Sequence, residues 1–167
     1  MLDIAPPDLM HAKTDKSFAT RYFWWFLQIQ DAPLPECFIG ALPDYYVESH
    51  LAIQSKTAGA VLQEALAAYI RTYSEPAAIH AVCEDYRAAA GIDTRLLTAA
   101  RTAGQKIAPP LLAIWGGKGT VGQEFDVIGL WKREAVTVSG HPLPCGHLFP
   151  EEDPDGFLAS LDAFLTS

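Results

Sequence analysis

The most constraining feature of the sequence is an uninterrupted apolar run in its last third. Leu111-Leu112-Ala113-Ile114-Trp115 contains no charged residue, follows Pro109-Pro110 and ends at Gly116-Gly117. A strand that is apolar on both faces is typical of a parallel sheet that helices cover on both sides. Because parallel strands need helical crossovers between them, the chain is expected to adopt an α/β fold.

The rest of this region alternates between helix and strand. Residues 125–134 are expected to form a helix, residues 135–138 a second strand, and a final helix is expected to open at Pro154. His147 lies in the loop between this second strand and the final helix. Residues 2–5 are a third strand-like piece, so we expect a short parallel sheet of about three strands with flanking helices.

Between these strand segments the sequence has helical periodicity. Apolar side chains recur at intervals of three and four residues, and the fourth helical stretch is expected to begin with Ser74 as N-cap and Pro76 in its first turn. We therefore divide the chain into a core strand at 1–5, a helical insertion at 6–104 and the remainder of the core at 105–167.

Composition excludes several classes of protein. The net charge of −8 and the pI near 4.9 argue against nucleic acid and anionic membranes as partners. The densest apolar block, Phe23 to Leu27, is far shorter than the ~20 residues of a membrane span. Cys37, Cys83 and Cys145 have no CxxC spacing, so they predict reduced thiols in a cytoplasmic protein and no zinc site.

Four residues are candidates for chemistry. His147 lies in a glycine-containing loop after a strand, where a general base is often found, although a solvated loop histidine has the same pattern. Asp3, at the end of the first strand-like piece, either orients an imidazole or caps a turn. Trp24 and Tyr86, on apolar helices, either bind a small anion or belong to an aromatic core.

Short motifs spread over the whole chain identify a resemblance. In the helical part these are Tyr22-Phe23-Trp24, Pro33-Leu34-Pro35-Glu36 and Cys83-Glu84-Asp85-Tyr86-Arg87. In the last third they are Leu112-Ala113-Ile114-Trp115-Gly116 and Gly146-His147-Leu148-Phe149-Pro150-Glu151-Glu152. In this order and at this spacing, the motifs resemble the haloacetate (fluoroacetate) dehalogenases of the α/β-hydrolase superfamily.

The resemblance implies a partial α/β-hydrolase fold. Residues 1–5 would be the sixth strand, 6–104 the helical cap and 105–167 the end of the core. The resemblance places the nucleophile before Met1, and no Gly-x-Ser/Asp-x-Gly elbow occurs in the chain. We therefore expect the chain to be inactive alone, and to need a separate N-terminal half or to self-associate through the open sheet edge.

The resemblance also implies a reaction, the hydrolytic cleavage of a carbon–halogen bond in a small 2-haloacid. An aspartate displaces the halide and forms an ester, which a histidine-activated water hydrolyses without a cofactor. His147 matches that histidine, Asp3 its orienting aspartate, and Trp24 and Tyr86 the halide-binding residues. Phe23 stands where fluoroacetate-cleaving members typically have histidine, which favours chloro- or bromoacetate as substrate.

Two alternatives stay open at this point. An epoxide hydrolase-like enzyme of the same superfamily would share the core, but that class usually places a second tyrosine in the cap. The pair Trp24 and Tyr86 differs from that pattern. A non-catalytic binding module that kept the cap and its halide site is the other alternative.

Overall fold

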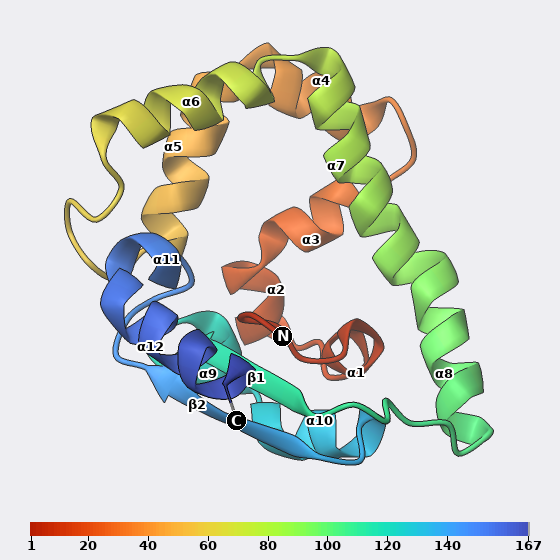
Figure 1. The fold of residues 1–167 in the computed structure, drawn as a ribbon. Helices are drawn as coiled ribbons and strands as arrows, with labels where there is room; N and C mark the ends of the chain where they lie inside the picture. Colours follow the sequence, from red (N-terminus) through yellow and green to blue (C-terminus); the bar gives the residue numbers. More distant parts are fainter. Residues whose placement is uncertain (167) are drawn as a thin grey trace.

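The computed structural model, which describes residues 1–166, has helices arranged around a two-stranded parallel sheet (Figure 1). Strand β1 (Leu111–Gly116) pairs with β2 (Val138–Leu143), from Leu111 opposite Val138 to Gly116 opposite Leu143. Helices α9 (Thr120–Glu124) and α10 (Val127–Glu134) connect the two strands. The predicted α/β fold with parallel strands is confirmed.

The helical stretch before the sheet curves into an arch in Figure 1, with α4 to α8 surrounding α1 to α3. Its helices are α1 (Pro7–Ala12), α2 (Lys16–Arg21), α3 (Phe23–Gln28), α4 (Leu34–Ala41), α5 (Pro43–Gln54), α6 (Gln63–Tyr73), α7 (Pro76–Ala88) and α8 (Thr94–Thr102), and a π-helical turn at Ala89–Asp93 joins the last two. Ser74 was predicted wrongly as the N-cap of α7. Glu75 holds that position, while the Ser74 hydroxyl donates to the Ile70 carbonyl at the end of α6.

The second strand lies further along the chain than predicted. Ala135 forms only an isolated bridge with Ile107, and β2 begins at Val138. Residues 138–143 have a poor strand propensity because Gly140 and Pro142 lie among them. Pro142 is tolerated at the outer strand of the sheet, and Gly140 is required because a Cβ there would lie 1.9 Å from the Ala113 carbonyl oxygen.

The third strand predicted at 2–5 is reduced to one bridge. Leu2 pairs in parallel with Ile114, and the Ile114 N–H donates to the Met1 carbonyl at 3.0 Å. The pairing stops at Asp3, which has a φ of 47° and therefore leaves the extended conformation. The described sheet thus has two strands and one bridging residue, where about three strands were expected.

One hydrophobic core joins the helices to the sheet. Its buried residues are Ala5, Met10, Phe18, Tyr22, Trp24, Trp25, Leu111, Ala113, Val121, Phe125, Val127, Trp131 and Ala135. The Trp131 indole N–H of α10 also donates to the Ile4 carbonyl at 2.7 Å. The arch and the sheet therefore share one hydrophobic cluster.

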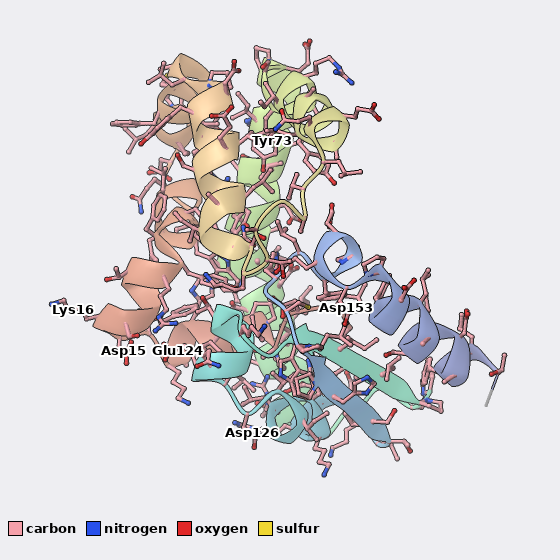
Figure 2. The ribbon with its side chains drawn as sticks, turned by 90° about the vertical axis from the view of Figure 1, so that its left-hand side faces the viewer. Asp15, Lys16, Tyr73, Glu124, Asp126 and Asp153 are labelled. Carbon is pink, nitrogen blue, oxygen red and sulfur yellow. The ribbon has the colours of Figure 1, made fainter. Side chains whose placement is uncertain are left out.

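The chain ends with two helices, α11 (Phe149–Glu152) and α12 (Pro154–Leu165). As expected for a helix opened by Pro154, the Asp153 carboxylate caps α12 by accepting from the Gly156 N–H. Asp126 caps α10 in the same way, so the helix predicted at 125–134 begins slightly later. Figure 2 shows both aspartates at the helix starts.

A buried ion-pair network links α8 to α1 and α10. Arg101 binds both oxygens of Asp8 at 2.8 and 3.1 Å, and its Nε donates to Glu134 at 2.7 Å. The side chains of Asp8 and Glu134 are only 6% and 7% exposed. Hydrogen bonding to Asp8, more than to Glu134, raises the pKa of Arg101, so the guanidinium remains charged.

Two further features bear on the sequence expectations. Cys37, Cys83 and Cys145 are free thiols, and the last two are buried. Among residues 1–166, no helix combines the length and the apolarity that crossing a membrane would require.

Candidate active site

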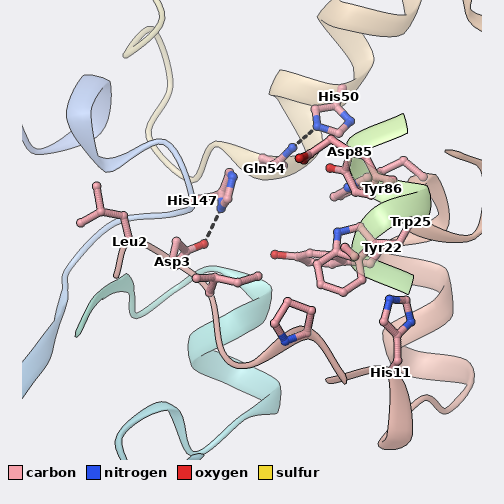
Figure 3. A pocket seen from close by; sticks show the side chains of 14 residues that line it. Leu2, Asp3, His11, Tyr22, Trp25, His50, Gln54, Asp85, Tyr86 and His147 are labelled. Carbon is pink, nitrogen blue, oxygen red and sulfur yellow. Dashed lines mark hydrogen bonds and ion pairs between the residues drawn. The ribbon is translucent and has the colours of Figure 1, made fainter. Parts of the chain in front are cut away.

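A cavity of about 320 Å³ lies where the arch meets the ends of the strands (Figure 3). Asp3, Trp24, Tyr86 and His147 all line it. Phe23 is outside this lining, 43% exposed, with its ring edge-on to Trp24 at 5.4 Å. The fold therefore brings together four of the five residues singled out by the sequence, and the role of Phe23 stays a prediction.

Asp3 is held rigidly at the edge of β1. Its N–H donates to the Ile114 carbonyl at 2.7 Å, and its Oδ1 accepts the Gly116 N–H at 2.7 Å. Its φ of 47° is a conformation that aspartate adopts more readily than most residues, and it turns the carboxylate back towards the strand end. Since the residue is 3% exposed, these bonds compensate the loss of solvation of its charge.

The second carboxylate oxygen of Asp3 is hydrogen-bonded to Nδ1 of His147 (Figure 3). The imidazole is 37% exposed, and its other nitrogen, Nε2, points away from Asp3. A carboxylate that accepts from Nδ1–H selects the tautomer in which Nε2 is free to take up a proton. The pair is therefore built to act as a general base.

Two glycines allow the histidine loop to lie against the end of β1. A Cβ on Gly116 would lie 1.8 Å from the Gly146 carbonyl oxygen, so no side chain fits there. Beyond this contact, the Gly117 and Lys118 N–H groups donate to the carbonyls of Leu143 and Cys145 at 2.8 and 2.9 Å. The loop is fixed to the strand end by backbone bonds, which explains the glycine-rich sequence.

The opposite wall of the cavity carries hydrogen-bond donors from the arch. Trp24 is 2% exposed, and burial raises the pKa of Tyr86, as do Tyr73 and Asp85, although a hydrogen bond from Trp24 lowers it. Burial, Asp3 and Tyr86 likewise raise the pKa of Tyr22, whose ring lies 4.8 Å from that of Trp24. Both phenols therefore keep their protons at neutral pH and can donate to an anion.

Sequence reasoning did not single out several other lining residues, among them Tyr22, His50 and Gln54. The Gln54 amide is hydrogen-bonded to Nε2 of His50, and the His50 ring lies 4.4 Å from the ring of Trp24. Burial, and then the proximity of His147, lower the pKa of His50 to about 4, so it is neutral at physiological pH. Their spacing of one turn on α5 is the only sequence signal that could have drawn attention to the pair.

We expect the largely enclosed His50 to make the chain acid-sensitive. The unfolded chain takes up a proton at the usual histidine pKa of 6.5 and the folded chain only at about 4. Stability is therefore complete above about 6.5 and falls as pH drops through this window, by on the order of 3 kcal/mol. Denaturant unfolding across this range should show a much weaker loss for His50→Gln.

The matched control for this experiment is His141→Gln, because His141 is exposed on β2. It should keep the wild-type acid sensitivity. If His50→Gln and the wild-type chain lose stability in parallel below pH 6.5, the largely enclosed neutral histidine is not the cause.

One other cluster has the donor atoms of a metal site. Ligand atoms of Glu36, His80 and Glu84 lie within 4.8 Å of one another. Arg87 occupies both carboxylates, at 2.9 Å from Glu36 and 2.5 Å from Glu84. The cluster is an ion-pair network between α4 and α7, and we propose no metal for it.

The fold and the comparisons with known proteins agree on a class: the chain has the fold of part of an α/β hydrolase. It is 34% identical over 167 residues to a fluoroacetate dehalogenase from Burkholderia sp, covering 99% of this chain and 54% of the relative. A soluble epoxide hydrolase from Corynebacterium sp. (strain C12) is 34% identical over 93 residues, or 55% of this chain and 30% of the relative. No protein-family model matches the chain.

Solved structures agree on the fold and differ in their stated activities. A protein described as an α/β hydrolase from Nostoc sp PCC 7120 has a TM-score of 0.94 and 48% identity, over 99% of this chain and 56% of that one. One described as an acyltransferase from Salmonella enterica has a TM-score of 0.94 and 50% identity, over 99% and 54%. A mutant described as an epoxide hydrolase from Pseudomonas aeruginosa, with bound MFA, has a TM-score of 0.91 and 34% identity, over 99% and 56%.

The chain thus spans about half the length of the relatives it matches. Since one fold carries several activities, the reaction has to be argued from the cavity.

Proposed function

We propose that this chain supplies the general base, its orienting carboxylate and the halide-binding cap of a hydrolytic dehalogenase that acts on small 2-haloacids. The nucleophile would come from the remaining half of the α/β-hydrolase fold. The observation that carries the proposal is a single cavity with the bonded pair Asp3 and His147 on one wall and the donors Trp24 and Tyr86 on the other.

In the first step a carboxylate oxygen outside this chain attacks the carbon that bears the halogen. The carbon–halogen bond breaks, the halide leaves with the bonding electrons, and an ester forms. The Trp24 N–H and the Tyr86 O–H would donate to the departing halide. Their burial strengthens these interactions because water does not compete for the anion.

In the second step water attacks the carbonyl carbon of the ester. His147 would accept a proton from that water at Nε2, and Asp3 would stabilise the resulting imidazolium. As the intermediate collapses, the imidazolium returns its proton to the departing alkoxide oxygen and the hydroxy acid leaves. The nucleophile's carboxyl group then loses a proton to solvent, which restores the carboxylate. A cavity of about 320 Å³ suits a substrate of a few heavy atoms.

Halide release from chloroacetate tests this proposal. The chain alone, the separately expressed N-terminal half of a related dehalogenase, and their mixture would be compared. We expect chloride only from the mixture. Chloride from this chain alone would mean that it contains a nucleophile, and no chloride from a mixture shown to be folded and associated would favour a non-catalytic binding module.

We expect the assembled enzyme to prefer chloroacetate over fluoroacetate, and Phe23→His to reduce that preference. Fluoride needs more hydrogen bonding than chloride to leave, and a bond to a charged group contributes about 1.5–3 kcal/mol, or roughly tenfold to a hundredfold in rate. The chloride-to-fluoride ratio of initial rates measures this. Phe38→His, at another exposed phenylalanine, is the control, and a wild-type ratio below one contradicts the prediction.

Epoxide hydrolysis is the second candidate, because Tyr22 lines the cavity together with Tyr86. Two protonated phenols could donate to the oxygen of an opening epoxide. The same mixture would be assayed with a terminal epoxide. Diol formation that is lost in Tyr22→Phe, with slow chloride release, would favour this candidate.

A further inference from the structure

Three consecutive backbone N–H groups around His147 all have acceptors. The Glu152 carboxylate accepts from Gly146 at 3.0 Å through Oε2 and from Leu148 at 3.1 Å through Oε1. The N–H of His147 itself donates to the Gln54 carbonyl at 3.2 Å. The Glu152 carboxylate therefore binds the residues on both sides of His147, and the Gln54 carbonyl at the end of α5 binds His147 itself.

The same carboxylate also bonds to the arch. Its Oε2 accepts the Lys56 N–H at 2.8 Å, just beyond the end of α5. A Cβ on Gly146 would lie 2.5 Å from the Gln54 carbonyl oxygen and 2.8 Å from the Lys56 nitrogen. Since the two backbones are as close as glycine permits, the histidine loop and the end of α5 are held as one piece.

Glu152 carries a charge suited to these bonds. Burial alone would raise its pKa, but the N–H groups of Gly146, Lys56 and Leu148 and the Thr57 side chain outweigh burial, and the pKa is lowered. Both oxygens of an ionised carboxylate accept hydrogen bonds. In a glutamine of the same shape, one of the two oxygens is replaced by an NH₂ group, which cannot accept from the backbone N–H groups that face it.

We propose that Glu152 is a positioning residue for His147. Its carboxylate fixes the backbone on both sides of the histidine and ties it to the end of α5. The imidazole is thereby kept on Asp3, next to the wall formed by His50 and Gln54. The role of His147 as base rests on the proposed function, whereas its fixed position is a property of this chain.

The experiment is proton NMR of the 167-residue chain, read at the Nδ1–H resonance of His147. We expect Glu152→Gln to shift this resonance upfield or to increase its exchange with water about tenfold or more, because the hydrogen bond to Asp3 is loosened. Glu151→Gln is the matched control. Glu151 accepts only the Tyr69 hydroxyl among the described side-chain bonds, at 2.5 Å, and its replacement should leave the resonance unchanged.

A folded Glu152→Gln chain with the wild-type resonance and exchange rate overturns the proposal. If that variant does not fold, Glu152→Asp decides, since it keeps the charge but is one methylene too short to reach both sides of the histidine. A folded Glu152→Asp chain with faster Nδ1–H exchange supports the proposal, and wild-type exchange overturns it. No substrate is used, so this outcome is independent of the halide-release assay.

Discussion

Replacing His147 with alanine is expected to stop the assembled enzyme after one halide ion per active site. In the proposed reaction, formation of the ester does not need the base, whereas its hydrolysis does, so the carboxymethyl ester should accumulate. Steady-state chloride release should fall by about four orders of magnitude. Rapid-mixing measurement of chloride together with the intact mass of the partner half would detect both the single turnover and the trapped ester.

Asp3→Asn should also slow hydrolysis of the ester, but through the tautomer and charge of His147 and not through loss of the imidazole. The isosteric amide can hold the imidazole in place but favours the wrong tautomer and does not stabilise the imidazolium, so hydrolysis of the ester is expected to slow. His141→Ala, at an exposed histidine, should retain full turnover. Repeated turnovers by the His147→Ala enzyme would show that another group activates the water.

The second large effect is expected in stability. Arg101→Met leaves the carboxylates of Asp8 and Glu134 buried without their cation. Removing one member of a buried ion-pair network costs about 3–5 kcal/mol in the free energy of unfolding. Denaturant unfolding of the 167-residue chain measures this. Arg95→Met, on the exposed side of the same helix, should change the stability by less than about 0.5 kcal/mol.

A triple replacement distinguishes two causes of the lost stability: the missing attraction of Arg101 for the carboxylates, and the cost of leaving those carboxylates buried without a cation. Arg101→Met combined with Asp8→Asn and Glu134→Gln removes the cation and both buried charges together. We expect it to recover a large part of the lost stability, because most of the cost comes from the unpaired carboxylates. If Arg101→Met alone costs less than about 1 kcal/mol, the network does not bind the arch to the sheet.

The pattern of apolar residues in the sequence was sufficient to predict most of the helices and the first strand. The apolar run of β1 and the helical spacing of the arch are local patterns, and both were predicted from the residues. The second strand was predicted too early in the chain. Its true position is fixed by pairing with β1, which overrides the poor strand propensity of Gly140 and Pro142. The strand at the start was overestimated because nothing local predicts the left-handed conformation of Asp3.

The candidate site was predicted less completely. Asp3 and His147 are 144 residues apart, so no local pattern joins them, and the resemblance to a family supplied the pairing. His50 and Tyr22 were missed because their properties arise from burial, which lowers one pKa and raises the other. Glu152 was noticed only as part of a motif. Two of its three backbone donors are local, but the third, the Lys56 N–H, lies 96 residues away in the sequence.

The shared core described above constrains how a substrate reaches the cavity. Swinging the arch open as a rigid lid would expose Trp24 and Trp25 and separate Arg101 from Glu134. Such an opening would cost far more than a loop displacement. Substrate entry and product release are therefore expected to depend on small movements of the residues at the mouth of the cavity, while the cavity walls stay in place.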